Sequence, residues 1–326
     1  MQVTRRGAIL AAPFIAAPAL SRAQEAAWPT RPVTMLVPFV AGGPSDIVAR
    51  LIATRMAGMV SQPVVAENRP GANGAVAAQA LARAAPDGHT LLTGSIGVFA
   101  INAALRPNLP YDPVRDFAPV TLAVTTPNVL IANPTAMPAR DFNGMMEWLR
   151  ANSGRASYST SGVGSSEHMT MELFKLRTRS DIQHVPYQGG AAAATALLAG
   201  DVQMTFQNLG TVAAHIQAGR MRALMVTSAE RHPTIPDVPT ARECGLDDFV
   251  VTSWQAVMAP AAVPAPVLAR LETMCRESLR HPESVQRLNG IGFDVVASSA
   301  ADYRRFQEAE IGRWREVVRA ANIRAE

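Results

Sequence analysis

Residues 33–56 read VTMLVPFVAGGPSDIVARLIATRM, and this stretch decides the fold. Residues 33–39 form an apolar, β-rich run, which is typical of a strand buried inside a sheet. Gly42 and Gly43 end this run. Apolar residues then return at helical spacing, so a helix is expected over residues 45–59. A buried strand that passes through glycines into a helix is the building unit of an α/β protein.

Strand-like and helix-like segments alternate through the rest of the chain, in two runs on either side of roughly residue 128. Such alternation is typical of parallel sheets in α/β proteins. No fixed-period repeat and no low-complexity linker interrupts it, so we expect two domains joined by strands. Further strands are expected at residues 64–67, 90–93, 120–124, 128–131, 156–159, 182–185, 203–206, 223–227 and 253–258, and helices at residues 75–85, 141–152, 165–176, 190–199, 212–218, 264–279 and 301–321, with a short piece at 285–288.

The N-terminal residues have the layout of a secretory signal. The pair Arg5-Arg6 precedes an uncharged, mostly apolar run at residues 7–20, and the small residues Ser21 and Ala23 stand at the offsets that signal peptidase requires. The run is too short to span a bilayer, which needs about 20 residues, and its prolines disfavour a buried N-terminal helix. We therefore expect cleavage after Ala23 and a periplasmic mature chain. The arginine pair fits a twin-arginine signal and an ordinary Sec signal alike, so both routes stay open.

Charge and hydropathy narrow the function classes. The formal net charge of +4 falls to +1 in the mature chain, because Arg5, Arg6 and Arg22 lie in the signal, which contains no acidic residue. The remaining arginines are scattered singly, so nucleic acid is not an expected partner. With 48% hydrophobic residues the chain can build sizeable cores. Because no segment after the signal is long and apolar enough to cross a bilayer, a soluble mature protein is expected.

Cys244 and Cys275 are the two cysteines of the chain. An oxidising periplasm permits a disulfide between them. Such a bond requires Cα atoms within about 7 Å of each other, which the sequence does not reveal. A disulfide and a pair of buried thiols therefore both stay open.

Three loops that connect a strand to a helix have the composition of a site for a small polar ligand. The first, residues 38–46, carries the glycine pair; glycines let the backbone approach a ligand, and free amides at a helix start attract anions. A tight turn with a serine or aspartate cap would explain the same residues. Residues 157–168 concentrate hydroxyl groups. The third loop, residues 186–190, is followed after the next strand by residues 206–209.

All of these loops follow the carboxyl ends of parallel strands, which is the edge where open α/β sheets bind ligands. Two domains would then present their loops to each other across a cleft. Hydroxyls and backbone amides are the donors that a carboxylate requires from an uncharged site. Trp254, in the strand expected at residues 253–258, is the tryptophan that we place near this cleft.

Motifs for catalysis or for a cofactor are not found in the sequence. There is no G-x-S-x-G nucleophile elbow and no phosphate loop, and Glu167 stands where a dinucleotide fingerprint requires its third glycine. His168 and Glu172 lie four residues apart on one helix face, where a metal ion can bind, but without H-E-x-x-H a helix-surface pair is the simpler interpretation. We expect no enzyme activity, no cofactor and no metal. A hydrolase that uses the same cleft is the alternative.

The motifs, taken in order, resemble the Bug-type receptors, which are the extracytoplasmic solute-binding proteins of tripartite tricarboxylate transporters. The resemblance covers the whole mature chain, and its specificity comes from the combination of many short pieces. Residues 207–210 (QNLG) depart from the acidic-Asn-Leu-Pro form of many relatives, so ligand preference there is open. The matching pieces are Pro38-Phe39 with Ala41-Gly42-Gly43, Asp46 and Ala49-Arg50; residues 67–72 (ENRPGA); residues 86–88 (PDG); residues 109–113 (LPYDP) with Asp116-Phe117; Ser161-Gly162 with Gly164-Ser165 and His168; Pro186-Tyr187 with Gly189-Gly190; and residues 198–200 (LAG).

The resemblance implies a type II periplasmic-binding-protein fold, in which two α/β domains joined by two crossing strands close on a ligand in the cleft between them. The crossings are expected near residues 127–129 and 251–253. Domain 1 would comprise residues 24–127 and 253–326, and domain 2 residues 128–252. The implied function is capture of a small carboxylate (a di- or tricarboxylate, an amino acid or an aromatic acid) by a soluble monomer, for the membrane components of the transporter. A sensory module that signals to a membrane kinase is a further alternative.

The resemblance also implies the ligand contacts. Residues 39–46 would bind one carboxylate through backbone amides, and residues 161–166 would add hydroxyls and amides from the second domain. Residues 93–95, 188–189 and 206–208 would line the cleft. The expected ligand-binding residues are Phe39, Ala41, Gly42, Gly43, Ser45, Asp46, Thr93, Ser95, Ser161, Gly162, Gly164, Ser165, Ser166, His168, Gln188, Gly189, Phe206 and Asn208.

Overall fold

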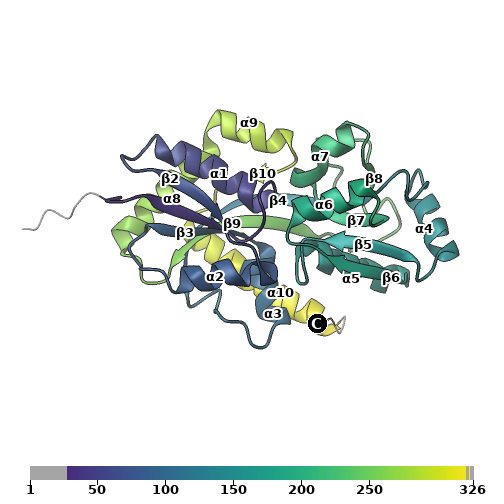
Figure 1. Cartoon of the computed structure of the whole chain (residues 1–326), viewed down its shortest axis with the longest axis horizontal. Helices are drawn as coiled ribbons and strands as arrows, with labels where there is room; N and C mark the ends of the chain where they lie inside the picture. Colours follow the sequence, from purple (N-terminus) through teal and green to yellow (C-terminus); the bar gives the residue numbers. More distant parts are fainter. Residues whose placement is uncertain (1–27, 321–322, 324–326) are drawn as a thin grey trace, which may run out of the picture.

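The computed structural model describes residues 28–320 and 323 of the chain (Figure 1). Its strands and helices alternate in chain order as the sequence indicates, and they form two halves that lie side by side in Figure 1. The expected signal peptide lies outside the described residues. Within them, no helix is both long enough and apolar enough to cross a membrane. The architecture is mixed α/β, as predicted.

The first half combines the N-terminal and the C-terminal segments of the chain. Its elements are β1 (Val33–Val37), α1 (Pro44–Ala57), β2 (Val64–Asn68), the 3-10 turn η1 (Ala72–Gly74), α2 (Ala75–Ala82), β3 (Thr90–Ser95), the π-helix η2 (Gly97–Ile101), α3 (Asn102–Leu105), the start of β4 (Phe117–Ala132), β9 (Thr252–Pro260), α8 (Ala265–Arg280), α9 (Pro282–Gly290), β10 (Asp294–Val295) and α10 (Ala300–Ala320). The sheet order is β2-β1-β3-β9-β4, with β1 parallel to β2 and β3 and with β9 antiparallel to β3 and β4. Helices α1, α8 and α9 bury one face of this sheet, and α2 and α10 bury the other.

The second half is formed by the middle of the chain. Its elements are the end of β4, α4 (Phe142–Ala151), β5 (Ala156–Thr160), α5 (Ser166–Thr178), β6 (Ile182–Pro186), α6 (Gly190–Ala199), β7 (Met204–Asn208), α7 (Leu209–Gln217) and β8 (Arg222–Val226). Strand β5 is parallel to β6 and β7, and β4 is antiparallel to β7 and β8. Apolar side chains of α4 and α5 form the core on one face, and those of α6 and α7 form it on the other.

Strand β4 runs through both halves. The sequence predicts two strands here, but a single strand of 16 residues is found. Pro127 stands opposite Thr252 of β9, and the next residue, Asn128, stands opposite Asn208 of β7. Proline cannot donate a hydrogen bond to a neighbouring strand. Its position therefore fits the point where β4 leaves one partner strand for another, and the strand continues through it.

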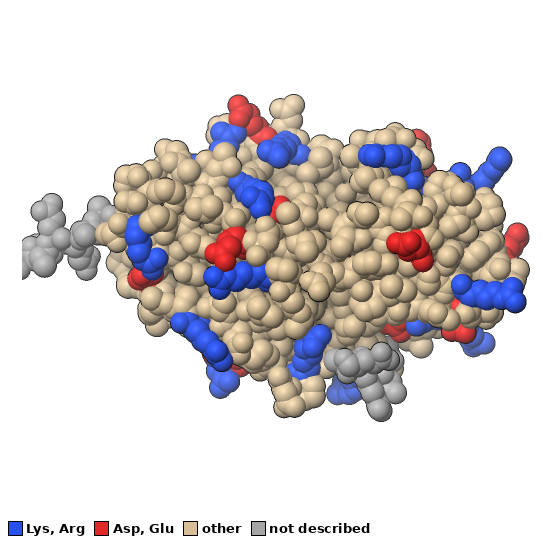
Figure 2. Space-filling model, in the orientation of Figure 1, with Lys and Arg blue, Asp and Glu red and all other residues tan. Residues whose placement is uncertain are grey.

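The sequence also misses some short elements. It does not predict η2 and α3, nor the two-residue strand β10 that pairs with β4. The short piece expected at residues 285–288 is the nine-residue helix α9. On the face shown in Figure 2, basic and acidic side chains are interspersed over the surface of both halves.

The two cysteines are free thiols. Cys275 is buried in the core beneath α1 and α8, with its Sγ 3.8 Å from Sδ of Met56, whereas Cys244 packs against the core of the second half. Burial raises the pKa of Cys275 to about 12 and that of Cys244 to about 11. Of the two alternatives, the structure therefore supports separate thiols, and the possible Cys244–Cys275 disulfide is not formed.

Candidate ligand-binding site

Three helices begin at the seam between the two halves: α1 from the first half, and α5 and α6 from the second. Their N-cap residues are Gly43, Ser165 and Gly189. A helix start carries amide N–H groups without intrahelical acceptors and the positive end of the helix dipole. Three such starts at one place favour an anion between them.

Glycines let the two halves approach each other closely at this seam. A Cβ atom added at Gly190 would lie 3.7 Å from Cδ of Pro44, and one added at Gly164 would lie 3.1 Å from Cδ2 of Leu105. Gly164 also has a φ angle of +84°, a conformation that side chains disfavour. A larger residue at Gly164 would hold the two halves apart.

A small cavity lies between the helix starts. Its volume is about 20 Å³. Space of that size holds about one water molecule, so the two halves are drawn together in this structure. The cavity is lined by Phe39, Gly43, Pro44, Ser45, Ser95, Ser161, Ser165, Ser166, Glu167, Gly190, Asn208, Ser253 and Gln255.

The loop before α1 is held in shape by Asp46. The carboxylate accepts hydrogen bonds from the N–H of Gly42 at 3.0 Å, from Nδ2 of Asn68 at 2.9 Å and from Nε of Arg50 at 2.9 Å. Burial alone would raise the pKa of Asp46, but these hydrogen bonds and the charge of Arg50 outweigh it and hold the pKa below its ordinary value. The carboxylate of Asp46 therefore stabilises the loop, and Asp46 does not line the cavity.

The loop before α5 brings hydroxyl groups to the cavity. Ser165 caps the helix by accepting a hydrogen bond from the N–H of His168 at 3.2 Å. The hydroxyls of Ser161 and Ser166 donate to Oε2 of Glu167, at 2.8 and 3.2 Å. The sequence analysis does not select Glu167, because its burial inside the cleft has no local signal in the sequence.

Strand β9 supplies two lining residues that sequence reasoning misses, Ser253 and Gln255. Oγ of Ser45 donates to Oε1 of Gln255 at 2.6 Å, and Oγ of Ser253 donates to Oδ1 of Asn208 at 3.2 Å. Trp254 lies between them but is fully buried in the core of the first half, so its predicted place near the cleft is wrong. Successive side chains of a strand point to opposite faces. The alternation in SWQ at residues 253–255 is the signal that would have found them.

Comparison with known proteins identifies the family. Residues 48–323 match the family described as tripartite tricarboxylate transporter family receptor, TctC. The chain belongs to this receptor family. It is similar to protein BugT of Bordetella pertussis, with 35% identity over 321 residues that cover 98% of each chain.

Solved structures resemble the receptor over most of its length. One is R. palustris Rpa4515 with adipate, with 35% identity and a TM-score of 0.88 over 91% of this chain and 99% of that one. Another is MatC (Rpa3494) from Rhodopseudomonas palustris with bound malate, with 35% identity and a TM-score of 0.85 over 89% of this chain and 100% of that one. These likenesses confirm the predicted periplasmic-binding-protein fold.

The structure divides the expected ligand-binding residues of the receptor into a lining set and an adjoining set. Those that line the cavity are Phe39, Gly43, Ser45, Ser95, Ser161, Ser165, Ser166 and Asn208. Those that lie in the adjoining loops and helix start are Ala41, Gly42, Asp46, Gly162, Gly164, Gln188 and Gly189. The lining set comes from both halves, so the loops selected from sequence do meet at one place.

Phe206, Thr93 and His168 do not line the cavity, contrary to expectation. Phe206 is fully buried in the core of the second half, and Thr93 is fully buried within β3. The ring of His168 stacks on that of His184, with 4.4 Å between ring centroids, and burial lowers the pKa of both to about 4. Among the described residues, no group of three or more histidine, cysteine and acidic side chains is arranged to hold a metal ion.

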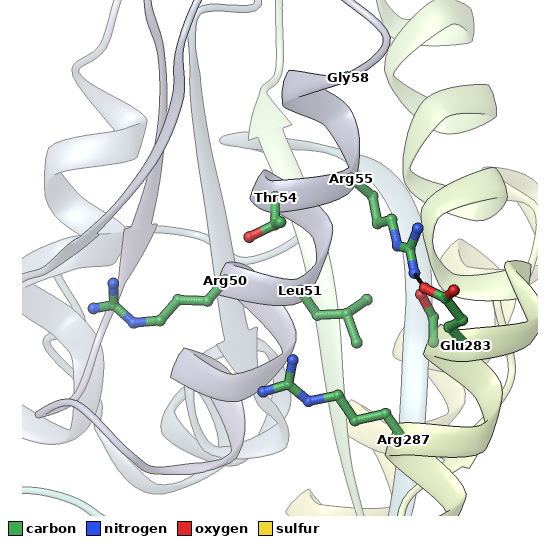
Figure 3. A pocket seen from close by; sticks show the side chains of 8 residues that line it. Arg50, Leu51, Thr54, Arg55, Gly58, Glu283 and Arg287 are labelled. Carbon is green, nitrogen blue, oxygen red and sulfur yellow. Dashed lines mark hydrogen bonds and ion pairs between the residues drawn. The ribbon is translucent and has the colours of Figure 1, made fainter.

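A larger hollow lies away from the seam, between α1 and α9 (Figure 3). Its volume is about 640 Å³, and its lining includes Arg50, Arg55, Glu283 and Arg287. Arg55 forms an ion pair with Glu283, and Arg50 forms one with Asp46. In Figure 3, Arg50 also points away from Arg55. We place the ligand at the seam because donors from both halves converge there.

Replacing Gly164 with alanine should oppose closure, because the new Cβ would meet Leu105 and the side-chain amides of Asn73 and Asn102 at 3.1–3.3 Å across the seam. Gly245→Ala is the matched control: its φ of +81° is close to that of Gly164, and nothing lies within 4 Å of its added Cβ. Both variants should lose about 1 kcal/mol of stability from the positive φ. Only Gly164→Ala should bind an organic acid about tenfold more weakly in titration calorimetry, which is about 1.4 kcal/mol. Equal affinities would contradict this contact as part of the closed state.

Proposed function

We propose that the receptor captures a small organic acid in the seam cavity and presents it, in the closed form, to the membrane components of a tripartite transporter. The observation that carries this proposal is the convergence of the starts of α1, α5 and α6 on one cavity. The structures of Rpa4515 with adipate and of MatC with bound malate, both 35% identical to this chain, support an organic acid as the ligand class.

Amides and hydroxyls, rather than cationic side chains, would hold the carboxylate. None of the described residues that line the cavity is a lysine or an arginine. A buried countercharge has a desolvation penalty of several kcal/mol, whereas a helix start presents its donors before the ligand arrives. One carboxylate would therefore bind at the first turn of α1, with the hydroxyl of Ser165 donating from the other half.

We attribute opening and closing to the two crossing strands. Domain 1 would comprise residues 24–127 and 253–326, and domain 2 residues 128–252. Strand β4 exchanges its partner at Pro127, opposite Thr252 of β9, and rotation there would separate the two domains. The nearly filled cavity of this structure supports such a motion, because the ligand-bound closed form must leave more room between the domains than this structure does.

The proposal also includes export of the chain to the periplasm. Residues 1–23 would be removed as a signal peptide, and the mature chain would act in the periplasm without turning over its ligand. The layout of the N-terminal residues and membership of a receptor family support this assignment. The match of residues 48–323 to a family of receptors supports binding rather than catalysis.

The mature protein should be stabilised against heat by one or a few organic acids and not by the matching neutral amides, because only the acid supplies an anion to the helix starts. A thermal-shift screen with adipate, malate and related acids, beside adipamide and malamide, measures this difference. A ligand that binds only the folded state adds about 2.7 kcal/mol of stability at 100 times its Kd. Stabilisation by the amides alone would contradict the anion-binding mechanism, but it would not contradict the fold.

Ser165→Ala should weaken binding of the acid at least about tenfold, because a hydrogen bond to a charged group contributes about 1.5–3 kcal/mol. Ser299→Ala is the matched control at the start of α10. Ser299 accepts a hydrogen bond from the N–H of Asp302 at 3.1 Å, as Ser165 accepts one from His168 at 3.2 Å, but it lies outside the cavity. Each variant should lose about 1 kcal/mol of stability with its cap. If calorimetry gives both variants the same Kd, the ligand does not contact Ser165.

A further inference from the structure

Glu167 is the ionisable side chain among the described residues that line the seam cavity. It occupies the first turn of α5 and is 3% exposed. A carboxyl group is an unexpected neighbour for a ligand carboxylate, since two like charges in a small cavity repel each other. The proposed function therefore leaves the role of Glu167 to be explained.

The contacts of Glu167 are neutral. The hydroxyls of Ser161 and Ser166 donate to Oε2, and Glu167 takes part in none of the ion pairs among the described residues. Burial raises the pKa of the Glu167 carboxyl, and the hydrogen bonds from the surrounding serines offset that rise only in part. Burial thus shifts the titration of this carboxyl towards higher pH.

The other titratable groups near the cavity form hydrogen bonds or stacking contacts with residues other than Glu167. On α5, the ring of His168 stacks on His184, and Glu172 accepts hydrogen bonds from Tyr158 and Lys175. On α1, the carboxylate of Asp46 is bonded to Gly42, Asn68 and Arg50. The lining residues from β3, α6, β7 and β9 are Ser95, Gly190, Asn208, Ser253 and Gln255, which do not titrate. A ligand carboxylate would therefore be the principal charge that Glu167 meets in the closed cavity.

We propose that Glu167 binds the ligand as a neutral carboxylic acid, donating its proton to an oxygen of the ligand carboxylate. This inference rests on the proposed function and specifies how the site selects its ligand. Two carboxyl groups that share a site hold one proton between them. The receptor would thus favour an acid over an amide, which lacks the anionic acceptor, and closure would trap a proton together with the ligand.

The proposal fixes the sign of the pH dependence of ligand affinity, because the protonated form of Glu167 is the binding form. As long as the ligand carboxylate is ionised, affinity falls as the pH rises through the pKa of Glu167, by up to about tenfold for each pH unit above it. The stability of the unliganded protein changes in the same direction. The raised folded-state pKa contributes stability that is fully present below about pH 4.3, the ordinary glutamate value, and that is lost as the pH rises through the folded-state pKa.

Titration calorimetry of the mature protein with adipate and with malate at pH 5.5, 7.0 and 8.5 tests the inference. The wild type should lose at least about tenfold in affinity between pH 5.5 and 8.5. Glu167→Gln should bind at every pH with little change, because its amide donates without titrating. Glu172→Gln is the matched control on the same helix, outside the cavity, and should keep the wild-type profile.

Three outcomes overturn the inference. In the first, wild type and Glu167→Gln share one pH profile, so Glu167 does not supply the proton. In the second, the affinity for both acids rises with pH, so the protonated form of Glu167 is not the binding form. In the third, neither the two probes nor any other acid of the thermal-shift screen binds wild type at any pH, which overturns the proposed function and this inference with it.

A measurement without ligand gives an independent readout. The melting temperature of Glu167→Gln, relative to wild type, should increase between pH 5.5 and pH 8.5, because only the wild type loses its buried proton. A constant difference over this range would show that Glu167 does not titrate there, and would also overturn the inference.

Discussion

The close approach of three helix starts is the contact on which the rest of the receptor depends. Glycine at the contact makes it possible: Gly189 has a φ of +126°, and a Cβ added there would lie 3.2 Å from Cβ of Phe39. In water, the end of one helix dipole contributes about 0.3–1 kcal/mol to holding a charge. Enclosed between the halves, the same donors act at a lower dielectric and bind an anion more strongly. In the proposed function, closure and anion binding would therefore be one event.

The strands contribute the side chains that line the cavity beneath the loops. Strand β9 brings Ser253 and Gln255 to the cavity, where they bond to Asn208 from the second half and to Ser45 from the first. Strand β4 passes from one sheet to the other at Pro127. The polar wall of the cavity is thus assembled beside the point where the two halves are joined, so the proposed rotation there would open the site without disturbing either core.

The sequence predicts the loops of this site better than the strand residues beneath them. A glycine pair or a run of hydroxyls marks a strand-to-helix loop locally, as at Gly43 and Ser165. Strand side chains depend on register and depth, which pairing across the sheet decides: Thr93 and Phe206 stand two residues before the lining residues Ser95 and Asn208, and Trp254 stands on the opposite face from Gln255. The continuity of β4, the separation of the cysteines and the burial of Glu167 likewise depend on tertiary contacts that no local pattern specifies.

The most direct test is a crystal structure of the mature protein grown with the organic acid that the thermal-shift screen selects. We expect a carboxylate oxygen of the ligand to lie at hydrogen-bond distance, about 2.7–3.2 Å, from first-turn amides of α1 and from Oγ of Ser165. We also expect the Glu167 carboxyl to contact the ligand. An acid bound instead in the hollow between α1 and α9, paired with Arg287, would contradict these expectations. So would a ligand at the seam that makes no contact with a helix start.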